Sequence, residues 1–186
     1  TADVKGNVRF DHVKFGYDPE QLVIKDFSAD VKEGQTVALV GPTGAGKTTM
    51  VKLLMRFYDL TDGAIYIDNH NLTDFTRSDL RTEFGMVLQD TWLYNGTIME
   101  NIRYGKLDAT DEEVIAAAKA AQVDHFVRTL PDGYNMVLNE EANNVSQGEK
   151  QLLTIARAIL ADPQIMILDE ATSSVDTRTE VLIQKA

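Results

Sequence analysis

A glycine-rich segment near the N-terminus constrains the fold more than any other feature of the chain. Residues 41–48 read GPTGAGKT, between an apolar run at 36–40 and a helical pattern over 48–58. This spacing between a strand and a helix is typical of a phosphate-binding loop, in which backbone N–H groups surround an anion at the helix N-terminus. The sequence therefore predicts a strand at 36–40, the loop, and a helix.

The residue types of the loop suit a triphosphate. Its glycines allow the backbone to approach the anion closely, and Lys47 would supply a point charge to the β- and γ-phosphates, while the Thr48 hydroxyl is placed to ligate Mg²⁺. A glycine-rich turn beside a surface lysine is the alternative, and the flanking pattern disfavours it. The predicted nucleotide contacts are Gly41, Pro42, Thr43, Gly44, Ala45, Gly46, Lys47, Thr48 and Thr49.

A second segment places two acids directly after a short apolar run. Residues 165–168 read IMIL and predict a strand buried on both faces of a parallel sheet. Ligands bind at the carboxyl ends of such strands. Asp169 fits an acid that holds Mg²⁺ through water, and Glu170 fits a general base that activates the attacking water. The alternative is that both acids begin a solvated loop.

A third segment predicts an amphipathic helix over residues 146–161. Ser146 and Glu149 have the spacing of a capping box, in which Ser146 would contribute about 1 kcal/mol to the helix. A helix that opens on Ser146 and Gly148 also presents a hydroxyl and free N–H groups to a γ-phosphate. Both roles are compatible at one helix start.

Composition and charge exclude several kinds of partner. The chain has 18 basic and 29 acidic residues, a net charge of -11, and no basic run, so neither nucleic-acid binding nor adsorption to anionic lipid is expected. No stretch approaches about 18 continuous apolar residues, so direct membrane insertion is not expected either. The absence of cysteine suits a reducing cytosol.

Strand-like alternation and helical periodicity divide the chain into parts. Residues 8–15, 27–31 and 64–68 predict an antiparallel β subdomain. Helical patterns dominate afterwards, with a capping box at Thr110 and Glu113 and a break at 131–133.

We therefore predict an α/β fold with a three-layer phosphate-loop core, an antiparallel β subdomain and an inserted helical subdomain. The core with its β subdomain is assigned to residues 1–89 and 162–186, and the helical subdomain to 90–161. A further helix is expected from Thr177, and its early end indicates an excised fragment, truncated at the C-terminus.

These segments together resemble the nucleotide-binding domain of exporter-type ATP-binding cassette (ABC) transporters, over essentially the whole chain. Residues 145–149, VSQGE, are similar to the family's signature motif, Asp169 and Glu170 resemble the end of its Walker B motif, and 173–176 resemble its D-loop.

The resemblance implies roles for residues outside these motifs. Gln89 falls at the Q-loop glutamine, a contact to Mg²⁺ and the catalytic water, and Tyr17 matches the aromatic that stacks on adenine; a strand-end aromatic in a small hairpin is the alternative for Tyr17. Asp176 falls in the D-loop and is expected at the nucleotide. Glu140 matches an acid that contacts the membrane domain, while Trp92 and Tyr94 would face that domain or pack against the helical lobe.

The implied function is binding and hydrolysis of ATP with Mg²⁺, powering an exporter at the cytoplasmic face of the cell membrane. The implied partners are the coupling helices of a transmembrane domain and a second nucleotide-binding domain, which meets this one head to tail. The alternatives are a non-transport ABC ATPase in DNA repair or translation, and a regulatory half of a heterodimeric exporter.

The chain also departs from the family pattern. Val145, Gln147, Glu149 and Ala142 replace the usual signature-region residues, and a carboxylate at 149 is expected to repel a triphosphate mildly. The family's switch histidine follows the Walker B strand, whereas the histidines of this chain all precede it. Residues 1–186 alone are therefore expected to bind nucleotide weakly, hydrolyse it slowly if at all, and form no stable dimer.

Overall fold

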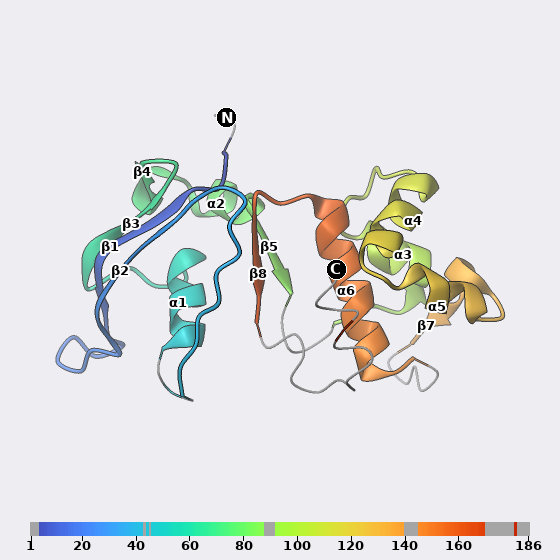
Figure 1. Cartoon of the computed structure of the whole chain (residues 1–186), viewed down its shortest axis with the longest axis horizontal. Helices are drawn as coiled ribbons and strands as arrows, with labels where there is room; N and C mark the ends of the chain where they lie inside the picture. The colour runs from blue at the N-terminus through green and yellow to red at the C-terminus, as the bar shows by residue number, and fades with distance from the viewer. Residues whose placement is uncertain are drawn as a thin grey trace. The chain divides into compact units, whose positions relative to one another are not determined.

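The computed structural model describes residues 4–42, 44, 46–87, 92–139, 145–169 and 181. It contains two compact units, residues 1–84 and residues 85–186 (Figure 1). The helix predicted from Thr177 lies outside the described residues, apart from Val181. Each unit is described by itself.

A four-stranded antiparallel sheet forms the framework of the first unit. Its strand order is β2-β1-β3-β4. The predicted antiparallel strands are present, with somewhat shifted ends. The strands are β1 (Val8–Phe15), β2 (Ile24–Val31), β3 (Asp62–Ile67) and β4 (His70–Asn71). Alternation along β1 buries one face, because successive side chains of a strand point to opposite sides.

Helix α1 (Lys47–Leu54) supplies the other half of this core, and Figure 1 shows it within the curve of the sheet. The helix ends earlier than the predicted residue 58, since Arg56 adopts a left-handed conformation (φ 53°). There its Nη1 donates to the carbonyl oxygens of Leu72 and Phe75, at 3.4 and 2.9 Å. Leu72 begins the short helix η1 (Leu72–Asp74) and Phe75 follows it, and α2 (Arg77–Thr82) comes next.

The strand predicted at residues 36–40 was wrong. None of the described strands includes this run, and Val37 and Val40 are 55% and 89% exposed. An apolar run favours an extended strand, but only hydrogen bonds to a neighbouring strand make it one. No described strand pairs with residues 36–40.

The second unit is built mainly from helices around its own apolar core. Short helices surround α6, with a small two-stranded antiparallel sheet of β6 and β7 beside them. Its elements are β6 (Gly96–Thr97), α3 (Ile98–Arg103), α4 (Asp111–Ala120), α5 (Asp124–Thr129), η2 (Gly133–Asn135), β7 (Val137–Leu138) and α6 (Gln147–Ala161). The capping boxes predicted at Thr110 and Ser146 are both confirmed.

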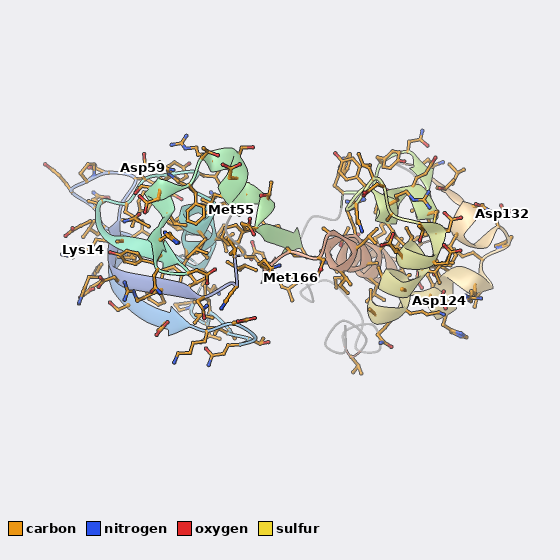
Figure 2. All side chains as sticks on the ribbon, turned by 90° about the horizontal axis from the view of Figure 1, so that it is seen from above. Lys14, Met55, Asp59, Asp124, Asp132 and Met166 are labelled. Atoms are coloured by element: carbon orange, nitrogen blue, oxygen red, sulfur yellow. The ribbon has the colours of Figure 1, made fainter. Side chains whose placement is uncertain are left out.

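A two-stranded sheet pairs β8 (Ile165–Leu168) with β5 (Phe84–Val87). The strand predicted at 165–168 is confirmed, but the expectation that both its faces are buried was wrong. Met166 (labelled in Figure 2) and Leu168 are 41% and 56% exposed. In the described part of the chain β8 pairs with one strand, and one of its two faces is more exposed than the other.

None of the helices that the structure describes combines the length and the apolar character needed to cross a bilayer.

Candidate functional site

The N-terminus of α1, which follows the phosphate loop, has no side-chain cap. Gly44 and Gly46 have positive φ values of 82° and 93°, a conformation that favours glycine. Gly46 occupies the N-cap position of α1 without a side-chain hydrogen bond, and the first turn contains no acid. Backbone N–H groups at such a helix start, with the positive end of the helix dipole, suit an anion.

Lys47 begins α1 and turns its ammonium group back toward the loop. Its Nζ donates a hydrogen bond to the Gly41 carbonyl oxygen at 2.5 Å. Phosphate oxygens bind an ammonium group more strongly than a neutral carbonyl does. An anion bound in the loop would therefore compete with the Gly41 carbonyl oxygen for Nζ, and Nζ already lies at the loop.

Tyr17 lies in the same unit, at a short turn between β1 and β2. Its side chain is 54% exposed. Its hydroxyl lies 3.4 Å from Oγ1 of Thr49, which is buried in the first turn of α1. The ring predicted to carry adenine is thus linked to the helix that starts at the phosphate loop.

The predicted magnesium ligands fall in different units. Thr48 is exposed in the first turn of α1. Asp169 follows β8, and its backbone N–H donates to the Val87 carbonyl oxygen at 2.9 Å, which extends the β5–β8 pairing to this residue. A hydroxyl and a carboxylate are the hard oxygen donors that Mg²⁺ prefers, so both residues fit this ion chemically.

Ser146 and Gly148 open helix α6 in the second unit. The Ser146 side chain is exposed at the N-cap, whereas Gly148 is buried. The Glu149 carboxylate accepts a hydrogen bond from the Ser146 backbone N–H at 2.8 Å. The carboxylate expected to repel a triphosphate therefore has a structural partner at its own helix start.

Several predicted site residues lie outside the described residues, and their roles stay predictions. They are Thr43, Ala45, Gln89, Glu140, Glu170 and Asp176.

Sequence reasoning missed a polar pair in the second unit, formed by the buried Asn101 and the half-buried Arg157. Arg157 of α6 donates from Nε to the Asn101 carbonyl oxygen (2.8 Å), from Nη1 to the Trp92 carbonyl oxygen (2.9 Å) and from Nη2 to Asn101 Oδ1 (3.2 Å). Burial lowers the pKa of the Arg157 guanidinium. Polar residues within the apolar patterns of α3 and α6 were the signal that could have revealed the pair.

This pair supports an exposed aromatic cluster of Trp92, Tyr94 and Tyr104. Trp92 and Tyr104 are 58% and 56% exposed, and the Arg157 guanidinium lies 5.6 and 5.5 Å from their ring centres. Asn101 also binds the backbone of Tyr94 through its side-chain amide, with N···O distances of 2.9 and 3.0 Å. The cluster is therefore held by hydrogen bonds to Arg157 and Asn101, while the Trp92 and Tyr104 rings are exposed.

Comparison with known proteins places these features in one family. The family model described as ABC transporter matches residues 24–173. The chain is 58% identical over 184 residues to a fatty acid ABC transporter ATP-binding/permease protein of Mycobacterium bovis, covering 99% of this chain and 29% of that protein. It is 48% identical over 175 residues to the mitochondrial iron-sulfur clusters transporter atm1 of Aspergillus fumigatus, covering 94% of this chain and 24% of that protein.

A solved structure, a bacterial Atm1-family ABC exporter with ATP bound, matches with a TM-score of 0.87 at 42% identity. The match covers 99% of this chain and 33% of that one, so the chain spans a third or less of the length of these relatives. The matched part contains the phosphate loop and the signature-like segment. The chain belongs to the ABC transporter family and corresponds to its nucleotide-binding domain, an ABC ATPase fold.

Proposed function

We propose that this chain binds and hydrolyses Mg·ATP, and that hydrolysis powers export by an ABC transporter at the cytoplasmic face of the cell membrane. The start of α1 carries the proposal: it lacks a side-chain cap and a first-turn acid, and it brings the Lys47 ammonium to the loop. A positive charge at a helix N-terminus is unfavourable by itself. A bound phosphate would compensate for it.

Each candidate residue has a role in this proposal. Lys47 would orient the β- and γ-phosphates, and Tyr17 would stack on the adenine. Thr48 and, through water, Asp169 would hold Mg²⁺, together with Gln89. When bound, the ion neutralises charge on the phosphate oxygens. Glu170 would take the proton of the attacking water, and Asp176 would contact the nucleotide.

Two kinds of partner complete the proposal. In a head-to-tail pair of nucleotide-binding domains, Ser146 and Gly148 of one copy would close over the triphosphate held by the other. The exposed aromatic cluster and Glu140 would contact the coupling helices of a transmembrane domain. The relatives named as ATP-binding/permease proteins support this second partner.

Phosphate release by the intact protein in lipid vesicles tests the proposed function. We expect Mg·ATP to bind and to be hydrolysed without any nucleic acid present. Turnover that required DNA or ribosomes would support the non-transport alternative instead. Tight binding without phosphate release would support the regulatory alternative.

A further inference from the structure

We propose that Tyr58 is a positioning residue for the nucleobase: it holds the Tyr17 ring in place before nucleotide binds, and Thr49 fixes the hydroxyl end of that ring. The inference rests on the proposed function, because it concerns the base end of the same nucleotide site. All the residues involved belong to the first compact unit.

The backbone that carries Tyr17 is held by its neighbours. The Gln21 N–H donates to the Asp18 carbonyl oxygen at 2.9 Å, and the Val23 N–H donates to the Phe15 carbonyl oxygen at 2.8 Å. A Cβ atom at Gly16 would lie 2.4 Å from the Gln21 carbonyl oxygen, so no larger residue fits there. The remaining freedom of Tyr17 is therefore the rotation of its side chain.

Two aromatic rings restrict that rotation. The Tyr17 ring centre lies 5.0 Å from that of Phe15 and 5.2 Å from that of Tyr58, with interplanar angles of 80° and 89°. Phe15 and Tyr58 also contact each other, at 5.7 Å. Perpendicular ring pairs at these distances are attractive. The three rings thus form a closed cluster that sets the plane of the Tyr17 ring.

The exposed fractions of the three rings indicate that Tyr58 supports Tyr17 and is not part of the hydrophobic core. Phe15 is 4% exposed and belongs to the core, whereas Tyr17 and Tyr58 are 54% and 42% exposed. A replacement of Tyr58 should therefore disturb the Tyr17 ring more than the packing of the sheet against α1.

Thr49 links the ring to the phosphate end of the site. The Tyr17 hydroxyl lies 3.4 Å from Thr49 Oγ1, and Thr49 is 8% exposed in the first turn of α1, two residues after Lys47. Because α1 starts at the phosphate loop, this contact fixes the position of the Tyr17 ring relative to the groups that would bind the phosphates. Ordering a free side chain on binding costs free energy, so a ring held in advance gives tighter stacking.

Titration calorimetry of the intact protein with Mg·ATP and with Mg·tripolyphosphate tests the inference. We expect Tyr58→Leu to weaken ATP binding by about three- to ten-fold, the effect of ordering one more side chain, and to change tripolyphosphate affinity by less than about two-fold. Tyr58→Phe should retain wild-type affinity for both, because it keeps the ring. Tyr17→Phe, which loses only the Thr49 contact, should weaken ATP binding by about two-fold.

Tyr66→Leu is the matched control, because Tyr66 lies on β3 opposite Arg9, at the other end of β1 from Tyr17. It should change neither affinity. Partial unfolding of a variant would lower the binding stoichiometry and not the ratio of the two affinities. Unchanged ATP affinity in Tyr58→Leu, or equal losses for ATP and tripolyphosphate, would overturn the positioning role. A wild-type protein that bound neither ligand would overturn the proposed function itself.

Discussion

The Ser146 hydroxyl oxygen accepts a hydrogen bond from the Glu149 backbone N–H at 3.2 Å, and the Glu149 carboxylate accepts one from the Ser146 N–H at 2.8 Å. These reciprocal bonds satisfy two donors at the start of α6. The same helix start is the part of the chain proposed to meet the triphosphate of a second copy. The capping bonds therefore organise the segment before any nucleotide is present.

Replacement of Ser146 and replacement of Glu149 should change the stability of the protein by different amounts. We expect Ser146→Ala to lower the free energy of unfolding by about 1 kcal/mol, since it removes the N-cap acceptor. Glu149→Gln should change it by less than about 0.5 kcal/mol, because glutamine also serves in a capping box. Urea unfolding followed by circular dichroism measures both, and an equal loss in the two variants would contradict the assignment.

Lys47→Ala should weaken Mg·ATP binding as well as hydrolysis. The substitution removes a charge-assisted contact to the phosphates, which should cost about ten-fold or more in affinity. Lys52→Ala is the matched control, because Lys52 lies in the last turn of the same helix. Calorimetry that found the same affinity in both variants would contradict the phosphate-loop assignment.

Glu170→Gln should keep ATP affinity within a few-fold but lower turnover by on the order of 10²-fold or more, the range for loss of a general base. The amide keeps the size of the side chain while removing its basicity. Calorimetry and phosphate release on the same preparation separate binding from turnover. Wild-type hydrolysis in this variant would exclude Glu170 from the role.

Arg157→Met should lower the free energy of unfolding by about 1–3 kcal/mol, because it leaves the buried Asn101 carbonyl oxygen without its arginine donor and removes the hydrogen bonds to Asn101 Oδ1 and Trp92. Trp92 is the one tryptophan of the chain, so a change in its fluorescence emission would show that the aromatic cluster has lost its contacts with Arg157. Arg128→Met is the control, since that arginine is 59% exposed and pairs with Asp124, which is labelled in Figure 2. It should cost about 1 kcal/mol or less, and equal costs would contradict the structural importance of Arg157.

The hydrogen bonds between Asp68 and the N-terminal segment of the first unit should weaken in acid. Burial raises the pKa of its carboxyl, but hydrogen bonds from Asn7 and from the backbone N–H groups of Lys5 and Gly6 lower it by more, so the folded-state pKa lies below the ordinary value. The stabilisation is therefore complete above the unfolded pKa, about 4, and is lost as the pH falls through the folded value.

Amide exchange of Asn7 measures this effect, because its N–H donates to Asp68 Oδ1 at 2.9 Å. We expect protection of Asn7 to be constant above about pH 4 and to fall as the pH drops below that value in the wild type. Asp68→Asn should remove that dependence on pH. The same pH profile in both proteins would show that another group is responsible.

The sequence alone was sufficient for features set by short-range spacing. The helix start at Gly46 and Lys47, the capping boxes at Thr110 and Ser146, and the apolar runs that became β1 and β8 all depend on residues a few positions apart. Turn, cap and strand preferences are local properties of the backbone, so they can be read from a pattern.

Pairing and burial were decided by the tertiary structure, because they depend on groups far apart in the chain. Residues 36–40 have a strand pattern without a described partner strand, and the Leu168 side chain of β8 is exposed although the run is apolar. Arg157 reaches Asn101 and Trp92 only after α6 has packed beside α3. The contacts of Tyr58 and Thr49 with Tyr17 likewise exist only once α1 and the sheet have come together, because side chains distant in sequence meet through packing and not through spacing.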